Sequence, residues 1–270
     1  MNTGRQSPRP CIYLKTIYVD RGFIPEYGVS LARTVAYLCK TGRMDLHIGR
    51  EAYGDNAERQ LNRSAHHFYF ETNCTHFLIQ GSDTDWDPTY WAHMAEQDAS
   101  VICGLYATKN PNEIQWCFNP LAPGLPGAGV IDPVTKLEII EKGGLECMMI
   151  RRDFFERYQI FYPEEYYDSD IAGPEYGRRE WNYFGWRAVA NPTPVKPDGK
   201  RRLSEDFAIC HCAKEMGLEV VMDHSDFCGH WDLRTRFPIQ KPELVDLVSG
   251  VTSAMPSATQ ENNPFSPHIE

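Results

Sequence analysis

The first hundred residues alternate between short apolar runs and stretches in which apolar residues recur at helical spacing. The apolar runs are rich in β-branched and aromatic residues, which predicts strands over 11–19, 44–48, 75–80 and 101–106. Regular alternation of strands with helices is typical of an α/β fold, a mainly parallel sheet flanked by helices. In such folds ligands bind beyond the carboxyl ends of the strands.

Three helices are expected between these strands. One covers 29–40, because Val29, Ala32, Ala36 and Cys39 recur at helical spacing. A second covers 57–73, where Ala57, Leu61, Ala65 and Phe68 share one face. The third begins at Asp87-Pro88, an acidic N-cap followed by a proline, and runs to about residue 98.

The second half of the chain is less regular. Residues 110–144 are rich in Pro and Gly, which predicts loops that line a cleft. Residues 158–202 mix aromatic and charged side chains without a clear period. The remaining patterns predict a strand over 146–150, a short helix over 152–157, a helix from Ser204 to about 216 ended by Gly217, and a strand over 218–222. We expect flexible ends at 1–10 and 249–270 around one domain, 11–248.

The formal net charge of -10 gives no general basic surface for nucleic acid or an anionic membrane. Basic clusters such as Lys200-Arg201-Arg202 are interpreted as solvated faces. Residues 1–10 form no apolar leader and no long apolar run follows, so we expect a soluble, cytoplasmic protein. The nine scattered cysteines predict reduced thiols. Cys210-His211-Cys212 lacks a second pair with zinc-ribbon spacing, which disfavours a zinc site.

Asp83-Thr84-Asp85 follows a predicted buried strand and precedes a predicted helix. Side chains two positions apart in a strand share a side, so we expect both carboxylates to face the cleft. Hard divalent ions bind carboxylate oxygens and leave positions for phosphate oxygens, which suits a nucleoside diphosphate with Mg²⁺ or Mn²⁺. Turn formation or helix capping is the alternative explanation of such a tripeptide.

The segment 75–106 as a whole resembles the central block of GT-A glycosyltransferases, especially family-2-like enzymes of bacteria and their phages. It contains an apolar strand, Asp83-Thr84-Asp85, a helix started by Pro88, and Val101-Ile-Cys-Gly-Leu-Tyr106, in which Cys103 departs from the usual small residue. Segments 143–155, 204–207 and 222–230 follow in the family's order. The resemblance covers about 10–235 and is weakest at 158–202. It implies a Rossmann-like GT-A domain with a nucleotide-sugar-binding half, 11–106, and an acceptor-side half, 107–248, with an irregular insert.

The resemblance also implies roles for individual residues. Asp83–Asp85 bind the donor, and Asp83, Asp85 and His230 of the Gly-His turn hold Mn²⁺ or Mg²⁺. Asp206 is the base of an inverting transfer. His224 is the rival of His230, and a helix N-terminus capped by Ser204 is the alternative explanation of the acidic residues that follow it.

Further contacts are expected around these residues. Arg59 of Ala57–Arg63 resembles the family's helix start near the nucleotide, with Arg63 as its alternative. Tyr18, at the end of the first strand, is a candidate to stack on the base, or a core aromatic residue. The weaker candidates for acceptor contacts are Gly144, Glu205, Trp181 and Trp186.

The expected function is transfer of a sugar from a nucleotide-sugar, UDP-sugars being favoured over GDP-sugars, to a hydroxyl-bearing acceptor. A modified base in DNA is one candidate acceptor. The first rival is a nucleotidyltransferase of similar fold, which usually carries a Gly-rich basic phosphate loop after strand one; Val19–Ile24 is a poor version of it. The second rival is a catalytically silent sugar- or nucleotide-binding module.

Overall fold

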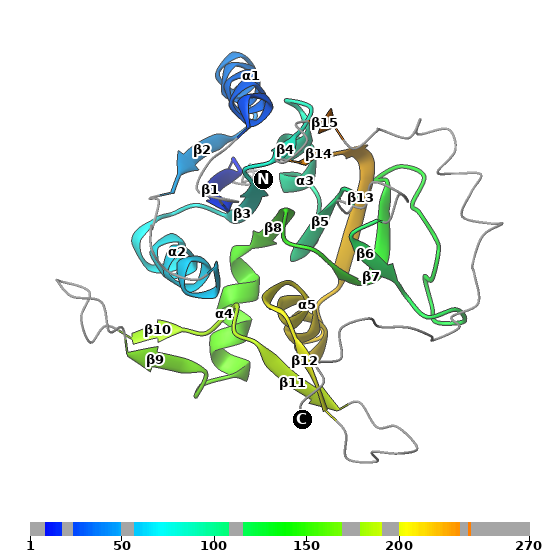
Figure 1. The fold of residues 1–270 in the computed structure, drawn as a ribbon. Coiled ribbons are helices and arrows are strands. Elements are labelled where there is room, and N and C mark those ends of the chain that lie inside the picture. Colours follow the sequence, from blue (N-terminus) through cyan, green and yellow to red (C-terminus); the bar gives the residue numbers. More distant parts are fainter. Residues whose placement is uncertain are drawn as a thin grey trace, which may run out of the picture. The chain divides into compact units, whose positions relative to one another are not determined.

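A mixed eight-stranded sheet forms the centre of the protein (Figure 1). The computed structural model describes residues 9–17, 24–49, 57–107, 116–168, 179–190, 200–232 and 237–238, all within the compact unit Met1–Ile239. The strand order is β2 (Asp45–Ile48), β1 (Cys11–Ile17), β3 (His76–Gly81), β8 (Cys147–Arg151), β5 (Val101–Leu105), β13 (Val220–Phe227), β7 (Leu137–Gly143) and β6 (Phe118–Pro120). Only β8 and β7 run against the other strands of this sheet. The predicted α/β class with a mainly parallel sheet is confirmed.

Helices cover both faces of the sheet because side chains alternate along each strand. On one face, Ile12 and Leu14 of β1 pack in a cluster with residues of α1 (Pro25–Thr41) and α3 (Tyr90–Ala95). On the other face, the ring of Tyr13 contacts Phe68 of α2 (Ala57–Glu71). The helices α4 (Arg152–Phe161) and α5 (Glu205–Glu215) lie on the same side as α2 (Figure 1).

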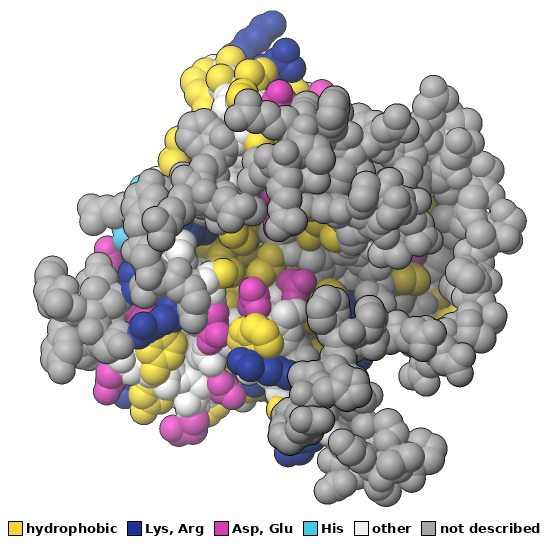
Figure 2. Space-filling view, viewed as in Figure 1, with side chains coloured by type: hydrophobic (Ala, Val, Ile, Leu, Met, Phe, Trp, Pro, Cys, Tyr) yellow, Lys and Arg dark blue, Asp and Glu magenta, His cyan; other side chains and the backbone are white. Residues whose placement is uncertain are grey.

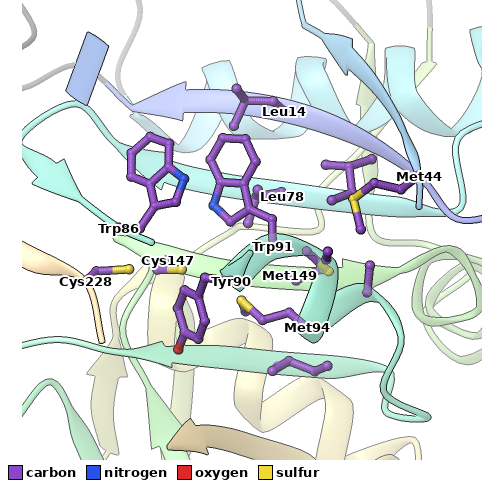
Figure 3. Close-up of a cluster of buried hydrophobic side chains, with 14 of the residues drawn as sticks. Leu14, Met44, Leu78, Trp86, Tyr90, Trp91, Met94, Cys147, Met149 and Cys228 are labelled. Carbon is purple, nitrogen blue, oxygen red and sulfur yellow. The ribbon is translucent and has the colours of Figure 1, made fainter. Parts of the chain in front are cut away.

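The core between α1, α3 and the sheet is built around two tryptophans (Figure 3). The rings of Trp86 and Trp91 stack with centroids 4.6 Å apart. The indole N–H of Trp86 donates to Thr34 Oγ1 at 2.9 Å, and its backbone N–H donates to Ser30 Oγ at 3.3 Å. The residue that follows Asp85 is therefore fixed in the core by stacking and by hydrogen bonds.

The structure corrects several predicted boundaries. Helix α1 begins at Pro25, and Val29, Ala32, Ala36 and Cys39, whose spacing predicted it, are exposed. Its buried face carries Tyr27, Ser30, Thr34 and Leu38, because the hydroxyl groups of Ser30 and Thr34 bind Trp86. The helix predicted from Asp87 is shorter, since Asp87 Oδ1 accepts from the N–H and hydroxyl of Thr89 and forms a turn.

Other elements are longer than expected or were not predicted. Helix α4 continues to Phe161, and β13 continues to Phe227 with an irregularity between Asp223 and Phe227. The stretch without a clear period contains two antiparallel pairs, β9 (Tyr166–Asp168) with β10 (Arg179–Trp181), and β11 (Arg187–Ala190) with β12 (Lys200–Leu203). A small sheet joins β4 (Thr84–Asp85), β14 (Gly229–Asp232) and β15 (Phe237–Pro238). Tyr18, residues 1–8 and the predicted tail 249–270 lie outside the described residues.

None of the helices in the described ranges is long and apolar enough to cross a lipid bilayer.

Trp91→Ala tests the importance of the stacked pair. Trp91 is fully buried, so we expect the free energy of unfolding to fall by about 3–5 kcal/mol, from lost burial and the cavity left behind. Urea unfolding measures the change. Ile160→Ala on α4, where the side chain is 81% exposed, should change stability by no more than about 0.5 kcal/mol. Equal losses in the two variants would contradict the role assigned to Trp91.

His76 at the start of β3 predicts a pH dependence of stability. Burial, with a smaller contribution from the charge of Arg151, lowers the pKa of His76 from 6.5 to about 4. Between these values the unfolded chain binds a proton that the folded chain does not. Stability is therefore lost as the pH falls from 6.5 to about 4, by roughly 3 kcal/mol from this residue. Unfolding curves of His76→Gln should show a smaller loss over this range, whereas His47→Gln, at an exposed position on β2, should follow the wild type.

Candidate functional site

The site lies where several strands of the sheet end. Strand β3 ends at Gly81, a turn at Ser82-Asp83 follows, and the chain then forms β4. Strand β4 pairs antiparallel with β14, in the register Gly229 with Asp85 and His230 with Thr84. Two segments far apart in the sequence therefore lie side by side. The turn also means that Asp83 and Asp85 do not continue a single strand, as the sequence had suggested.

The buried amide of Gln80 holds this turn in place. Its nitrogen donates to Thr84 Oγ1 at 2.6 Å and to the Glu146 carbonyl at 3.1 Å. Its oxygen accepts from Trp91 Nε1 at 3.1 Å. Thr84 Oγ1 in turn donates to the Gly81 carbonyl at 2.7 Å. A single side chain thus ties the Asp83–Asp85 turn to the start of β8 and to the tryptophan core.

A third carboxylate, that of Glu146, lies beside Asp83. A Cβ placed on Gly81 would be 1.7 Å from Glu146 Oε2 and 3.2 Å from Asp83 Oδ1. Both oxygens therefore surround the space that the missing side chain of Gly81 leaves open. The Gly81 N–H donates to the Glu146 carbonyl at 2.8 Å, which fixes the two backbones together. Glycine at 81 is what allows the carboxylates of Asp83 and Glu146 to converge.

The carboxylate of Asp85 occupies a similar space above Gly229. A Cβ on Gly229 would be 1.8 Å from Asp85 Oδ1 and 2.9 Å from its carboxyl carbon. Asp85 Oδ1 is buried and accepts no hydrogen bond from any part of the chain that the structure describes. A buried carboxylate oxygen without a donor is costly, and a bound cation would compensate it. This arrangement fits a hard divalent cation.

The chain leaves β7 at Gly143 and continues through Gly144 to β8. A Cβ on Gly144 would be 1.9 Å from the Tyr106 hydroxyl and 3.6 Å from Cys117 Cβ. The Tyr106 hydroxyl accepts from the Glu146 N–H at 3.3 Å. Burial raises the pKa of the Cys117 thiol to about 11, and the charges of Glu146 and Asp206 both raise it.

Asp206 is fixed in the first turn of α5. Its Oδ1 accepts from the Ser204 hydroxyl and, at 2.8 Å, from the Phe207 N–H. Ser204 occupies the N-cap position, but its side chain makes no capping hydrogen bond to the helix backbone. Figure 2 shows acidic side chains near the middle of the face seen in Figure 1, with Lys and Arg side chains next to them.

The other predicted residues are placed as follows. Arg59 and Arg63 lie on α2, and the charges of Arg59 and Glu205 both act on Glu58. The Nε2 of His224 is 2.8 Å from Glu138 Oε2. The side chain of His230 and all of Tyr18 lie outside the described residues.

The two predicted tryptophans, Trp181 and Trp186, lie in different surroundings. The Trp181 ring contacts Tyr166, with centroids 5.8 Å apart, in the β9–β10 pair. Trp186 is 45% exposed and borders a surface pocket of about 460 Å³ that Arg187, His211 and Glu215 also line.

No group of three or more His, Cys, Asp or Glu side chains is gathered for metal binding within the ranges that the structure describes. The His230 side chain is not part of that set. Sequence reasoning missed Glu146, Gln80 and Tyr106. The signal for Glu146 was its position as the first residue of the strand predicted over 146–150, which becomes informative only once that strand is known to run antiparallel.

No protein-family model and no curated protein matches the chain. Among solved structures, "A197 from STIV" aligns with a TM-score of 0.45 and 11% identity over 87% of this chain and 95% of that chain. The catalytic domain of Drosophila β1,4-galactosyltransferase 7, in complex with xylobiose, aligns at 0.40 and 11% over 91% and 82%. The inositol-1-phosphate CTP transferase from T. maritima aligns at 0.37 and 10% over 92% and 98%. At these TM-scores the similarities carry no argument about the reaction of this chain.

Gly229→Ala tests the packing of Asp85 against Gly229. The added methyl group would collide with the Asp85 carboxylate, so we expect a loss of about 1–3 kcal/mol in stability. Asp85→Ala removes the colliding group. In that background, Gly229→Ala should lower the free energy of unfolding by clearly less than it does in the wild type. Urea unfolding of the two single variants and the double variant measures this coupling. Additive losses would show that the carboxylate does not occupy the space above Gly229.

Proposed function

We propose that the chain is a divalent-metal-dependent glycosyltransferase that moves a sugar from a nucleotide-sugar to an acceptor hydroxyl, with inversion at the transferred carbon. The observation that supports it most is the carboxylate of Asp85 beside Gly229, with the carboxylates of Asp83 and Glu146 beside Gly81 at the carboxyl end of β3. Ligand sites of α/β folds occur at such strand ends.

Asp85, with its buried oxygen that lacks a donor, is the first candidate to hold Mn²⁺ or Mg²⁺, together with Asp83 and His230. Magnesium usually takes one or two protein carboxylates and fills its other positions with water and substrate phosphates. Two aspartates near a strand end suit that requirement, because the protein does not have to supply every ligand of the ion. When bound, the ion would neutralise negative charge on the leaving nucleoside diphosphate.

Asp206 is the proposed base. The Ser204 hydroxyl and the Phe207 N–H hold one carboxylate oxygen, which leaves Oδ2 as the atom to accept the proton of the acceptor hydroxyl.

The proposed donor is a UDP-sugar in preference to a GDP-sugar. Arg59 and Tyr18 are proposed to contact the nucleotide, and Gly144, Glu205, Trp181 and Trp186 the acceptor. A hydroxyl-bearing acceptor remains the proposal, with a modified DNA base as one candidate.

The products separate this function from nucleotidyl transfer. A glycosyltransferase releases a nucleoside diphosphate from a nucleotide-sugar, whereas a nucleotidyltransferase releases pyrophosphate from a nucleoside triphosphate and a sugar phosphate. Thermal unfolding with UDP- and GDP-sugars, with and without Mn²⁺, identifies the donor, because a ligand that binds the folded state raises its apparent stability. Absence of any metal-dependent stabilisation with every donor would reject the proposal.

Asp206→Asn and Asp85→Asn should affect different steps. Asp206→Asn removes the proton acceptor, so turnover should fall by a factor of about 10²–10⁴ while metal-dependent donor binding is kept. Asp85→Asn should lose the metal-dependent stabilisation by the donor as well. Asp168→Asn, at an exposed position on β9, should behave as the wild type in both assays. Full turnover in Asp206→Asn would remove that residue from the role of base.

A further inference from the structure

Two cysteine side chains are in contact at the amino ends of β1 and β3. The Sγ atoms of Cys11 and Cys74 are 3.0 Å apart, although 63 positions separate the two residues along the chain. Cys11 is the first residue of β1, and Cys74 lies just before β3 begins at His76. Both are free thiols. The candidate site lies at the carboxyl end of β3, so this pair is at the opposite end of the strand.

Hydrogen bonds hold the backbones of this pair side by side. The Thr75 N–H donates to the Cys11 carbonyl at 2.8 Å, and the Cys11 N–H donates to Thr75 Oγ1 at 2.9 Å. The residue that follows Cys74 is thus bound to Cys11 through both its N–H and its hydroxyl. Neighbouring strands lie about 4.8 Å apart, within the range of Cα separations that a disulfide spans, and the two sulfurs need to approach by only about 1 Å to form a bond. The sheet therefore already has the spacing that a disulfide needs.

Access to solvent distinguishes this pair from most of the other cysteines. Cys11 is half-buried, so a dissolved reagent can reach it, whereas Cys74 behind it is 3% exposed. Five further cysteines are at most 1% exposed, namely Cys103, Cys147, Cys210, Cys212 and Cys228. Cys39 on α1 is exposed. A reagent in solution should therefore modify Cys39 and Cys11 before any of the five.

The surroundings of Cys11 favour its protonated form. Burial, the largest cause, and the hydrogen bond with Cys74 raise the pKa of the Cys11 thiol to about 12. The charge of Asp45 also raises it, and the charge of Arg9, which is bound to Asp45, lowers it. The thiolate is the form that attacks a disulfide, so the pair reacts slowly near neutral pH and persists as two thiols unless an oxidant is abundant.

We propose that Cys11 and Cys74 form a disulfide when the protein meets a small-molecule disulfide such as oxidised glutathione. The Cys11 thiolate attacks one sulfur of the oxidant, releases one thiol, and becomes a mixed disulfide. The Cys74 thiolate then attacks the Cys11 sulfur and releases the second thiol. Two protein thiols are oxidised, the disulfide of the oxidant is reduced to two thiols, and the two protons pass to those thiols. This inference does not depend on the proposed function.

Oxidation of the full chain by oxidised glutathione tests the proposal. The reaction is run near about pH 8.5 to supply thiolate, the remaining thiols are alkylated, and the peptides are mapped by mass spectrometry without reduction. We expect one pair of peptides joined through Cys11 and Cys74, and a glutathione adduct on Cys39. A disulfide across so long a loop restricts the unfolded chain, so the midpoint of thermal unfolding should rise by at least about 5 °C and return to its starting value after dithiothreitol.

Three serine variants separate the two steps. In Cys74→Ser the mixed disulfide has no second thiol to attack it, so Cys11 should accumulate a glutathione adduct and the unfolding midpoint should not rise. In Cys11→Ser, Cys74 should stay a thiol because it is buried. Cys39→Ser is the matched control and should form the crosslink as the wild type does. Free Cys11 and Cys74 after an oxidation that has modified Cys39, a crosslink between two chains instead, or the same rise in Cys74→Ser would overturn the proposal.

Discussion

The hydrogen bonds of the Gln80 side chain are the constraint on which the candidate site depends. This buried amide forms hydrogen bonds with a hydroxyl, a carbonyl and an indole N–H. Inside a protein such a fully bonded group is rigid, because losing one partner leaves another buried polar group unsatisfied. The turn that carries Asp83 and Asp85 is thereby fixed relative to both β8 and the stacked tryptophans.

Two glycines then decide where negative charge can gather. Gly81 leaves room for Glu146 beside Asp83, and Gly229 leaves room for Asp85. Any larger residue would fill those spaces with carbon. The acidic part of the candidate site is therefore made by the absence of side chains as much as by the carboxylates.

Local patterns were sufficient for the α/β class, for the strand that ends beside Asp83, and for the helix that starts after Ser204. They failed where a distant partner decides the outcome. Ser30 and Thr34 look like solvent-facing positions of α1 until Trp86 is placed against them. Strand β8 was located correctly, but its periodicity does not reveal that it enters antiparallel between β3 and β5. That direction is what moves Glu146 to the site, so Glu146 was missed. The roles of Asp83, Asp85, Asp206 and His230 remain proposals.

The insertion of β8 also determines the order in which the site can be assembled. The centre of the sheet joins strands that are far apart in the sequence, and such pairs close late because long loops must be ordered first. During synthesis, Asp83 leaves the ribosome well before Glu146, and Asp85 well before Gly229. A growing chain therefore has the two aspartates without the neighbours that shape them. The arrangement around Gly81 and Gly229 is therefore complete only after β8 and β14 have been synthesised and have paired with β3 and β4.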